Sequence, residues 1–261
     1  MILSNFVVGQ GPRPTVMLHG FLGTGRNLRT LATAWSAADP ERRLLLPDLT
    51  GHGTSPGLPA DATLAGVARD VLDTARAAGL DGPLDVVGHS LGGRVALALS
   101  QLAPEAVARV DLLDITPGPV PHALSESGKV LEVLRAAPAR AADRKAMREE
   151  LTGRGLSGGL SDWLLMNLEP APEGGVRWRF DREALAHFHG RFLGEDLWPA
   201  LTRPGLPVRC IRGGRSQYVD ERAQARMEAL GCPVETLPEA GHFVHIDAAE
   251  AVLRWLQAGR V

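Results

Sequence analysis

The segment GHSLG at residues 88–92 constrains the fold of this chain most, because of where it stands. An apolar run at 84–87 precedes it directly, and a helical pattern at 91–103 follows. A strand that turns sharply into a helix at a serine strains the serine backbone and exposes its Oγ above the sheet. Glycines on both sides fit such a turn because they have no Cβ to clash. The segment therefore predicts a strand–turn–helix unit, with Ser90 as a candidate nucleophile at its tip.

Short apolar runs and helical patterns alternate on both sides of this unit. The expected strands cover residues 15–18, 44–46, 84–87, 110–113, 207–211 and 234–237. The expected helices cover residues 25–38, 62–79, 91–103, 219–230 and 247–258. Strands that alternate with helices form a parallel sheet covered by helices on both faces. We therefore predict an α/β fold, and 261 residues suffice for a single fold of this class.

Residues 117–200 interrupt this alternation. Prolines open the stretch, helical patterns follow at 124–136 and 139–151, and few strand signals appear. Because α/β enzymes bind ligands at the carboxyl edge of the sheet, we expect a mostly helical cap there. The core would then consist of residues 1–116 and 201–261. Candidate pocket-lining residues in the cap are Trp163, Met166 and Phe188, although such side chains can also form only the cap's own core.

The composition excludes several other classes of protein. Hydrophobic residues make up 44% of the chain, charged residues 22%, and the formal net charge is −2, which is typical of a globular domain. No basic tract indicates a nucleic-acid partner. No apolar segment approaches the roughly 18–20 residues that span a bilayer, and the first residues do not resemble a signal peptide. We expect a cytoplasmic protein without a membrane partner, and leave both a monomer and a homodimer open.

The two cysteines indicate neither a metal site nor a required disulfide. Cys210 lies in an expected strand and Cys232 beside a proline, without a CxxC motif or a Cys/His cluster. Zinc sites use such clusters, so no metal site is expected. We expect two buried thiols, with one disulfide as the alternative.

Two loops supply the remaining groups that an activated serine needs. Phe21 follows the first expected strand, and its backbone N–H is a candidate oxyanion donor together with the N–H of Leu91, the residue after the nucleophile. His242 follows the last expected strand and is the candidate general base. His89 and His245 are expected to pack or form hydrogen bonds rather than move protons.

Other polar residues near these loops have simpler expected roles. His19 should brace its own loop, and the segment 48–55, which includes Asp48 and His52, should form a structural loop beside the site. The expected chain order of serine, acid and histidine places both Asp48 and His52 too early to complete a triad.

Several segments together resemble one family. HGFLG, DLTGHGTS, GHSLGGRVAL, DITP, RGGRSQYV and EAGHFVH are similar to segments of the α/β-hydrolase superfamily, and the likeness extends over residues 13–258. Within that superfamily they resemble small bacterial carboxylesterases and abhydrolase-domain-11 proteins. The resemblance implies a mostly parallel sheet of about eight strands, an ester or thioester substrate and no cofactor.

The acid departs from the pattern of the family. Many members carry an aspartate in a G-x-x-D turn after the penultimate strand, and here that turn ends in Ser216. Asp114, at the end of the expected strand 110–113, is the proposed replacement. Asp220 is the main alternative, and Glu239 and Asp247 remain open.

Three functions remain compatible with the sequence. The first is a serine carboxylesterase that forms an acyl-serine intermediate. The second is a related serine enzyme, such as an acyl-CoA thioesterase, a carbon–carbon bond hydrolase or a perhydrolase. The third is a binding protein that has kept the fold, since a fold alone does not fix a function. A serine at position 90 excludes the chemistry of relatives whose nucleophile is aspartate.

Overall fold

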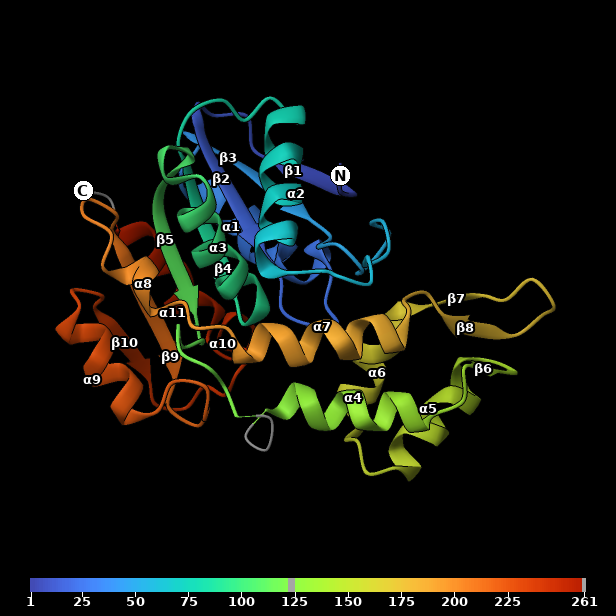
Figure 1. The fold of residues 1–261 in the computed structure, drawn as a ribbon. Coiled ribbons are helices and arrows are strands. Elements are labelled where there is room, and N and C mark those ends of the chain that lie inside the picture. The colour runs from blue at the N-terminus through green and yellow to red at the C-terminus, as the bar shows by residue number, and fades with distance from the viewer. Residues whose placement is uncertain (122–124, 260–261) are drawn as a thin grey trace.

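The computed structural model describes residues 1–121 and 125–259, and a seven-stranded sheet lies at its centre (Figure 1). In spatial order the strands are β1 (Asn5–Val8), β3 (Arg42–Pro47), β2 (Arg13–Leu18), β4 (Leu84–His89), β5 (Val107–Leu113), β9 (Val208–Gly213) and β10 (Val234–Leu237). β1 is antiparallel to β3, and the other neighbouring pairs are parallel. The expected α/β fold with a mostly parallel sheet is confirmed.

The strand count differs from the expected value of about eight, because seven strands form this sheet in the described chain. Six of them correspond to the apolar runs found in the sequence. The seventh, β1, lies at the edge with its side chains exposed or half-buried, so it has no apolar run to mark it.

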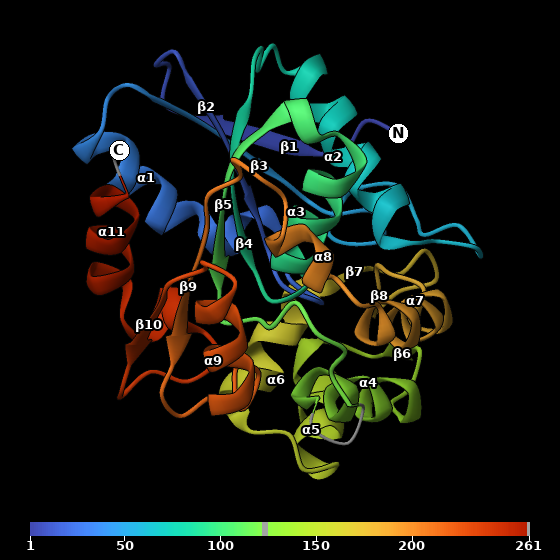
Figure 2. The same cartoon turned by 60° about the vertical axis from the view of Figure 1, so that its left-hand side comes forward.

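Helices cover both faces of the sheet (Figure 2). One face carries α1 (Arg29–Ala38), the short α10 (Val244–Asp247) and α11 (Ala249–Ala258). The other carries α2 (Leu64–Ala77), α3 (Leu91–Leu102), α8 (Trp198–Leu201) and α9 (Glu221–Ala229). Short 3-10 helices form at η1 (Gly25–Leu28) and η2 (Pro104–Ala106). Neighbouring strand residues point to opposite faces, so Met17 packs on the first face and Val16 and Leu18 on the second.

The 117–200 segment lies at the end of the sheet toward which β5 runs (Figure 1). Its helices are α4 (Glu126–Ala136), α5 (Arg144–Gly153), α6 (Gly158–Leu164), η4 (Leu165–Asn167) and α7 (Arg182–Gly194). Ser125, Asp143, Ser157 and Asp181 cap α4, α5, α6 and α7, respectively, by accepting hydrogen bonds from backbone N–H groups. Residue 124, where we expected the first helix to begin, lies outside the described residues.

A small antiparallel sheet was missed in this segment. It consists of β6 (Arg140–Ala141), β8 (Val176–Trp178) and β7 (Leu168–Pro170), in that order. Strands of two or three residues are too short to show an alternating pattern. The segment therefore contains helices and a β-hairpin rather than helices alone.

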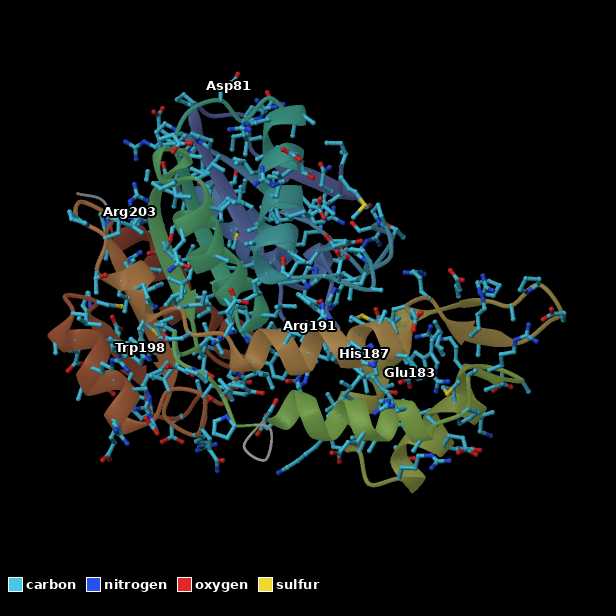
Figure 3. The ribbon with its side chains drawn as sticks, viewed as in Figure 1. Asp81, Glu183, His187, Arg191, Trp198 and Arg203 are labelled. Atoms are coloured by element: carbon cyan, nitrogen blue, oxygen red, sulfur yellow. The ribbon has the colours of Figure 1, made fainter. Side chains whose placement is uncertain are left out.

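One face of α7 is exposed to solvent, and the opposite face is buried. Glu183, His187 and Arg191, each one turn apart, are exposed along the helix (Figure 3). Phe188 and Phe192 on the opposite side are almost fully buried. This separation at helical spacing places α7 over the apolar interior of the protein.

A buried arginine of α3 forms hydrogen bonds with the backbone near both ends of the 117–200 segment. Arg94 is fully buried, and its guanidinium donates to the carbonyls of Thr116, Gly118 and Phe192 over 3.1, 2.8 and 2.9 Å, and to that of Glu195. Burial lowers the pKa of Arg94 to about 10, so the side chain stays charged at neutral pH. The segment is thus anchored where it leaves the core and where it returns.

Candidate active site

Ser90 stands at the turn between β4 and α3 in a strained conformation. Its φ is 51° and its ψ is −117°, which non-glycine residues rarely adopt. A Cβ on Gly88 would lie 2.3 Å from the Gly92 carbonyl oxygen, and one on Gly92 would lie 2.3 Å from that of Leu18. Both positions therefore require glycine, and the strand–turn–helix unit expected from the sequence is present.

Asp114 and His242 meet at the carboxyl edge of the sheet. Asp114 follows β5 with a φ of 53°, and its carboxylate is fully buried. His242 follows β10, and its Nδ1 lies 2.7 Å from Asp114 Oδ2. Because the carboxylate accepts this hydrogen bond, Nδ1 carries the proton and Nε2 is left free to act as a base.

Ser216, which stands where many relatives carry the acid, supports Asp114 instead. Its hydroxyl donates a hydrogen bond to Asp114 Oδ2, and the N–H of Gly213 donates to Oδ1 over 2.9 Å. Tyr218 stacks on the His242 imidazole, with ring centroids 4.0 Å apart. The turn after β9 thus holds both members of the Asp114–His242 pair without contributing a carboxylate.

The alternative acids are engaged elsewhere. Asp220 caps α9 and accepts from the N–H of Ala223 over 2.7 Å. Glu239 forms an exposed ion pair with Arg215. Asp247 accepts from the N–H of Gly241 over 2.8 Å. The described residues place Asp114, and none of these three, in hydrogen-bond contact with His242.

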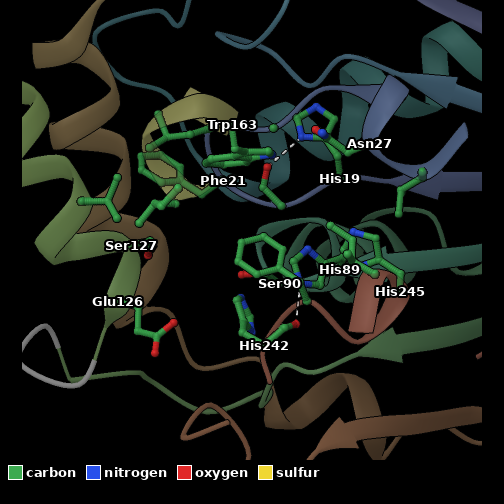
Figure 4. Close-up of a pocket in the computed structure, with 18 of the residues that line it drawn as sticks. His19, Phe21, Asn27, His89, Ser90, Glu126, Ser127, Trp163, His242 and His245 are labelled. Carbon is green, nitrogen blue, oxygen red and sulfur yellow. Dashed lines mark hydrogen bonds between the residues drawn. The ribbon is translucent and has the colours of Figure 1, made fainter. Parts of the chain in front are cut away.

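Ser90 and His242 line the same pocket, as Figure 4 shows. The pocket holds about 700 Å³ of space, part of it open to solvent. No hydrogen bond joins Ser90 Oγ to His242 among the described contacts. Contacts of this kind are often long in a free enzyme and shorten when substrate binds.

Of the two candidate oxyanion donors, Leu91 directly follows Ser90 and Phe21 lies in the loop after β2. Leu91 is the first residue of α3, where backbone N–H groups have no acceptor within the helix, although Leu91 itself does not line the pocket. Phe21 does line the pocket. The next residue, Leu22, has a φ of 62°, and its carbonyl accepts from Asn167 Nδ2 over 3.0 Å. A buried amide of the 117–200 segment therefore holds the Phe21 loop in place.

Burial favours the neutral form of four other histidines near the site, His19, His52, His89 and His245. His19 accepts from the N–H of Leu49 and donates to the carbonyl of Gly20, and burial lowers its pKa to about 4. Burial and His19 together lower the pKa of His52 to about 3. His19 thus braces the loop as expected.

His89 and His245 pack beside His242. His89 Nε2 donates to the His242 carbonyl over 2.9 Å, and the His89 and His245 rings are 4.5 Å apart. Burial, followed by the neighbouring histidines, holds the pKa of His89 well below its ordinary value. Burial, followed by His242, lowers that of His245 to about 4. Their contacts are those of packing and hydrogen-bonding residues.

Of the three candidate pocket residues of the 117–200 segment, one lines the pocket and two do not. Trp163 lines the pocket and packs against Phe243, with ring centroids 5.9 Å apart. Met166 is 46% exposed and does not line it. Phe188 is buried against Phe192 and does not line it either. The last two positions contradict our expectation, because α7 turns Phe188 into the core and η4 turns Met166 to solvent.

Four residues with a clear place in the site were missed from the sequence. Tyr218, Asn167, Ser127 and Glu126 all touch the pocket or the groups that shape it. Tyr218 lies in the segment RGGRSQYV, but no motif marks the other three. Asn167 and Ser127 form hydrogen bonds with residues distant in sequence. Cys210 and Cys232 are buried free thiols. None of the helices in the described part of the chain has the length and apolar content needed to cross a membrane.

Comparisons with known proteins show which family this chain resembles. A model described as the alpha/beta hydrolase family matches residues 15–255. The "sn-1-specific diacylglycerol lipase ABHD11" of Mus musculus is 31% identical over 93% of this chain and 80% of its own length. "Esterase YbfF" of Escherichia coli (strain K12) is 29% identical over 92% of this chain and 90% of its own. Among solved structures, a "Marine microorganism esterase" superposes with a TM-score of 0.87 at 22% identity, covering 98% of each chain, which shows the fold.

A parallel sheet with a strained serine at the end of β4 and a histidine–aspartate pair on the same edge defines an α/β hydrolase. The family match covers most of the chain. This chain therefore belongs to the alpha/beta hydrolase family.

Proposed function

We propose that this protein is a serine carboxylesterase in which Ser90, His242 and Asp114 form the catalytic triad. As a member of the alpha/beta hydrolase family with esterases and lipases among its relatives, the chain is a carboxylic ester hydrolase. The proposal adds the acyl-serine mechanism and its residues. The observation that carries it is the 2.7 Å contact between His242 Nδ1 and the buried Asp114, beside the strained Ser90.

In this mechanism, Ser90 Oγ attacks the ester carbonyl carbon while His242 Nε2 accepts the hydroxyl proton. The N–H groups of Phe21 and Leu91 stabilise the oxyanion that forms. The tetrahedral intermediate collapses, the carbon–oxygen bond to the alcohol breaks, and His242 gives its proton to the leaving alcohol. Water then attacks the acyl-serine, with His242 again as base, and releases the carboxylic acid and free Ser90.

Asp114 steadies the imidazolium that forms on His242 during both steps. Its carboxylate is fully buried and accepts three hydrogen bonds, so it is fixed in direction. The strain at Ser90 is compatible with a functional role, since such backbone conformations concentrate at active sites.

The same proposal covers the organisation of the chain. Residues 1–116 and 201–261 form the hydrolase core, and residues 117–200 form a cap over the pocket. Trp163 from α6 and Ser127 from α4 support this, because both line the pocket opposite Ser90 (Figure 4).

Hydrolysis of p-nitrophenyl esters by the wild type and by Ser90→Ala tests the proposal. The variant should lose about 10⁴-fold or more in kcat. Ser100→Ala, at a buried serine of α3 outside the pocket, is a matched control that should retain activity. Ester hydrolysis by folded Ser90→Ala at the wild-type rate would refute the proposal.

A further inference from the structure

The described residues that line the pocket beside Ser90 include one carboxylate and no lysine or arginine. Its lining is largely apolar and includes Val130, Leu160, Trp163 and Phe243. Among the described residues, Glu126 is the one acidic side chain that lines it, at an exposed position on the rim, and neither lysine nor arginine does. A ligand with a negative charge would meet a like charge here and find no lysine or arginine among the described residues of the lining.

Four histidines line the pocket, and the three besides His242 do not offset this charge. Burial lowers the pKa of His19 and of His245 to about 4, and that of His89 well below its ordinary value. All three are therefore neutral at neutral pH. No ion pair joins Glu126 to a cation in the part of the chain that the structure describes.

The position of Glu126 is tied to the catalytic histidine. Glu126 is the first residue of α4, and the N–H of the next residue, Ser127, donates to Tyr218 Oη over 3.3 Å. The Tyr218 ring in turn stacks on His242. The carboxylate of Glu126 points from α4 toward the side of the pocket that holds His242 (Figure 4). The start of α4 and the catalytic histidine thus share one contact, Tyr218.

We propose that Glu126 is a specificity-determining residue that restricts the site to uncharged esters and disfavours substrates with an anionic acyl or leaving group. The inference rests on the proposed esterase function. An anion that enters this largely apolar pocket loses water without gaining a lysine or arginine partner, and the Glu126 carboxylate at the rim repels it. Coenzyme A thioesters and half-esters of dicarboxylic acids belong to the disfavoured class, whereas the corresponding neutral esters and thioesters do not.

Two matched substrate pairs measure this discrimination. The acyl pair is p-nitrophenyl hexanoate and the mono-p-nitrophenyl ester of adipic acid, which differ by a terminal carboxylate. The leaving-group pair is hexanoyl-N-acetylcysteamine and hexanoyl-coenzyme A. The kcat/KM of each anionic substrate is divided by that of its neutral partner, after subtraction of spontaneous hydrolysis. The wild type should prefer the neutral member of at least one pair by about tenfold or more at low salt.

Variants assign that preference to Glu126. Glu126→Gln should reduce the preference for the neutral substrate by about tenfold in one pair, and Glu126→Lys should reduce it further. Added salt should weaken the preference of the wild type. Glu132→Gln removes the same charge from an exposed position on α4 outside the pocket and should leave the ratios unchanged.

The outcomes separate the inference from the proposed function. The inference is overturned if Glu126→Gln and Glu126→Lys hydrolyse the neutral substrates but leave the anionic-to-neutral kcat/KM ratio of both pairs unchanged. The proposed esterase function would then still stand. Failure of the wild type to hydrolyse either neutral substrate, without acylation of Ser90, overturns the proposed function itself.

Discussion

Replacement of Asp114 by asparagine changes one atom of the candidate triad and has a result that the structure specifies. The Gly213 N–H lies 2.9 Å from Asp114 Oδ1 and requires an acceptor there. We therefore expect the asparagine amide to place its oxygen at that position and its NH₂ at the position of Oδ2, where the Ser216 hydroxyl can turn from donor to acceptor but the Gly213 N–H cannot. That NH₂ would lie 2.7 Å from His242 Nδ1 and donate to it. His242 would then carry its proton on Nε2 and could not accept the proton of Ser90.

The size of the effect follows from the loss of this tautomer. An Asp→Asn exchange that leaves triad geometry intact lowers kcat by about 10⁴, or about 5 kcal/mol of transition-state stabilisation. The fold should survive, because asparagine keeps the size of the side chain and the hydrogen bond from Gly213. Loss of the charge costs about 1–3 kcal/mol of stability at this buried site.

The assay is kcat/KM on p-nitrophenyl butyrate, with thermal melts of each variant. Asp220→Asn is the matched control, since asparagine caps helices as well as aspartate does and α9 should remain intact. A folded Asp114→Asn enzyme with near-normal activity would refute the reasoning. So would a loss of activity confined to Asp220→Asn, which would place the acid in the turn after β9.

Two further results are expected. Trp163→Ala should shift the preferred acyl chain length of p-nitrophenyl esters, because each methylene that fits an apolar pocket contributes about 1–3 kcal/mol to discrimination. Met166→Ala changes an exposed residue outside the pocket and should leave the preferred chain length unchanged. The same preferred chain length in both variants would place the acyl site elsewhere. Stability should fall as pH drops from 6.5 toward 4, because the pKa values of His19 and His245 are lowered from 6.5 to about 4 and that of His52 to about 3, so that the unfolded chain binds more protons in this range. The lowered pKa of His19 alone corresponds to a loss of about 3 kcal/mol in the free energy of unfolding over this range. Melting temperatures that stay constant from pH 7.5 to 4.5 would contradict this prediction.

The sequence predicted the elements that local patterns encode. The turn at Ser90 was predictable because two glycines, an apolar run and a helical pattern stand in consecutive positions. The pairing of Asp114 with His242 was predictable from topology, since both follow parallel strands and parallel strands end at one edge of the sheet. Serine at position 216 was also informative, because it directed the search for the acid away from that turn position and toward Asp114.

The sequence did not predict features that depend on contacts between distant segments. β7 and β8 have three residues each, and the turn at Gly174–Gly175 was the one local signal of their hairpin. Asn167 supports Leu22 across 145 positions of the chain, and no pattern marks such a pair. Phe188 and Met166 were misplaced because composition identifies apolar residues but not the direction in which a helix turns them.

Trapping of the acyl-enzyme tests the central claim most directly. The purified protein is mixed rapidly with an activated ester, the burst of p-nitrophenol is measured, and the quenched protein is digested for mass spectrometry. The account predicts a burst close to one equivalent per chain and an acyl group on the peptide that contains Ser90. The account would be contradicted if the wild type hydrolysed the ester without a burst and the acyl group was found on a residue other than Ser90. A serine-directed phosphonate that labelled another residue would contradict it as well.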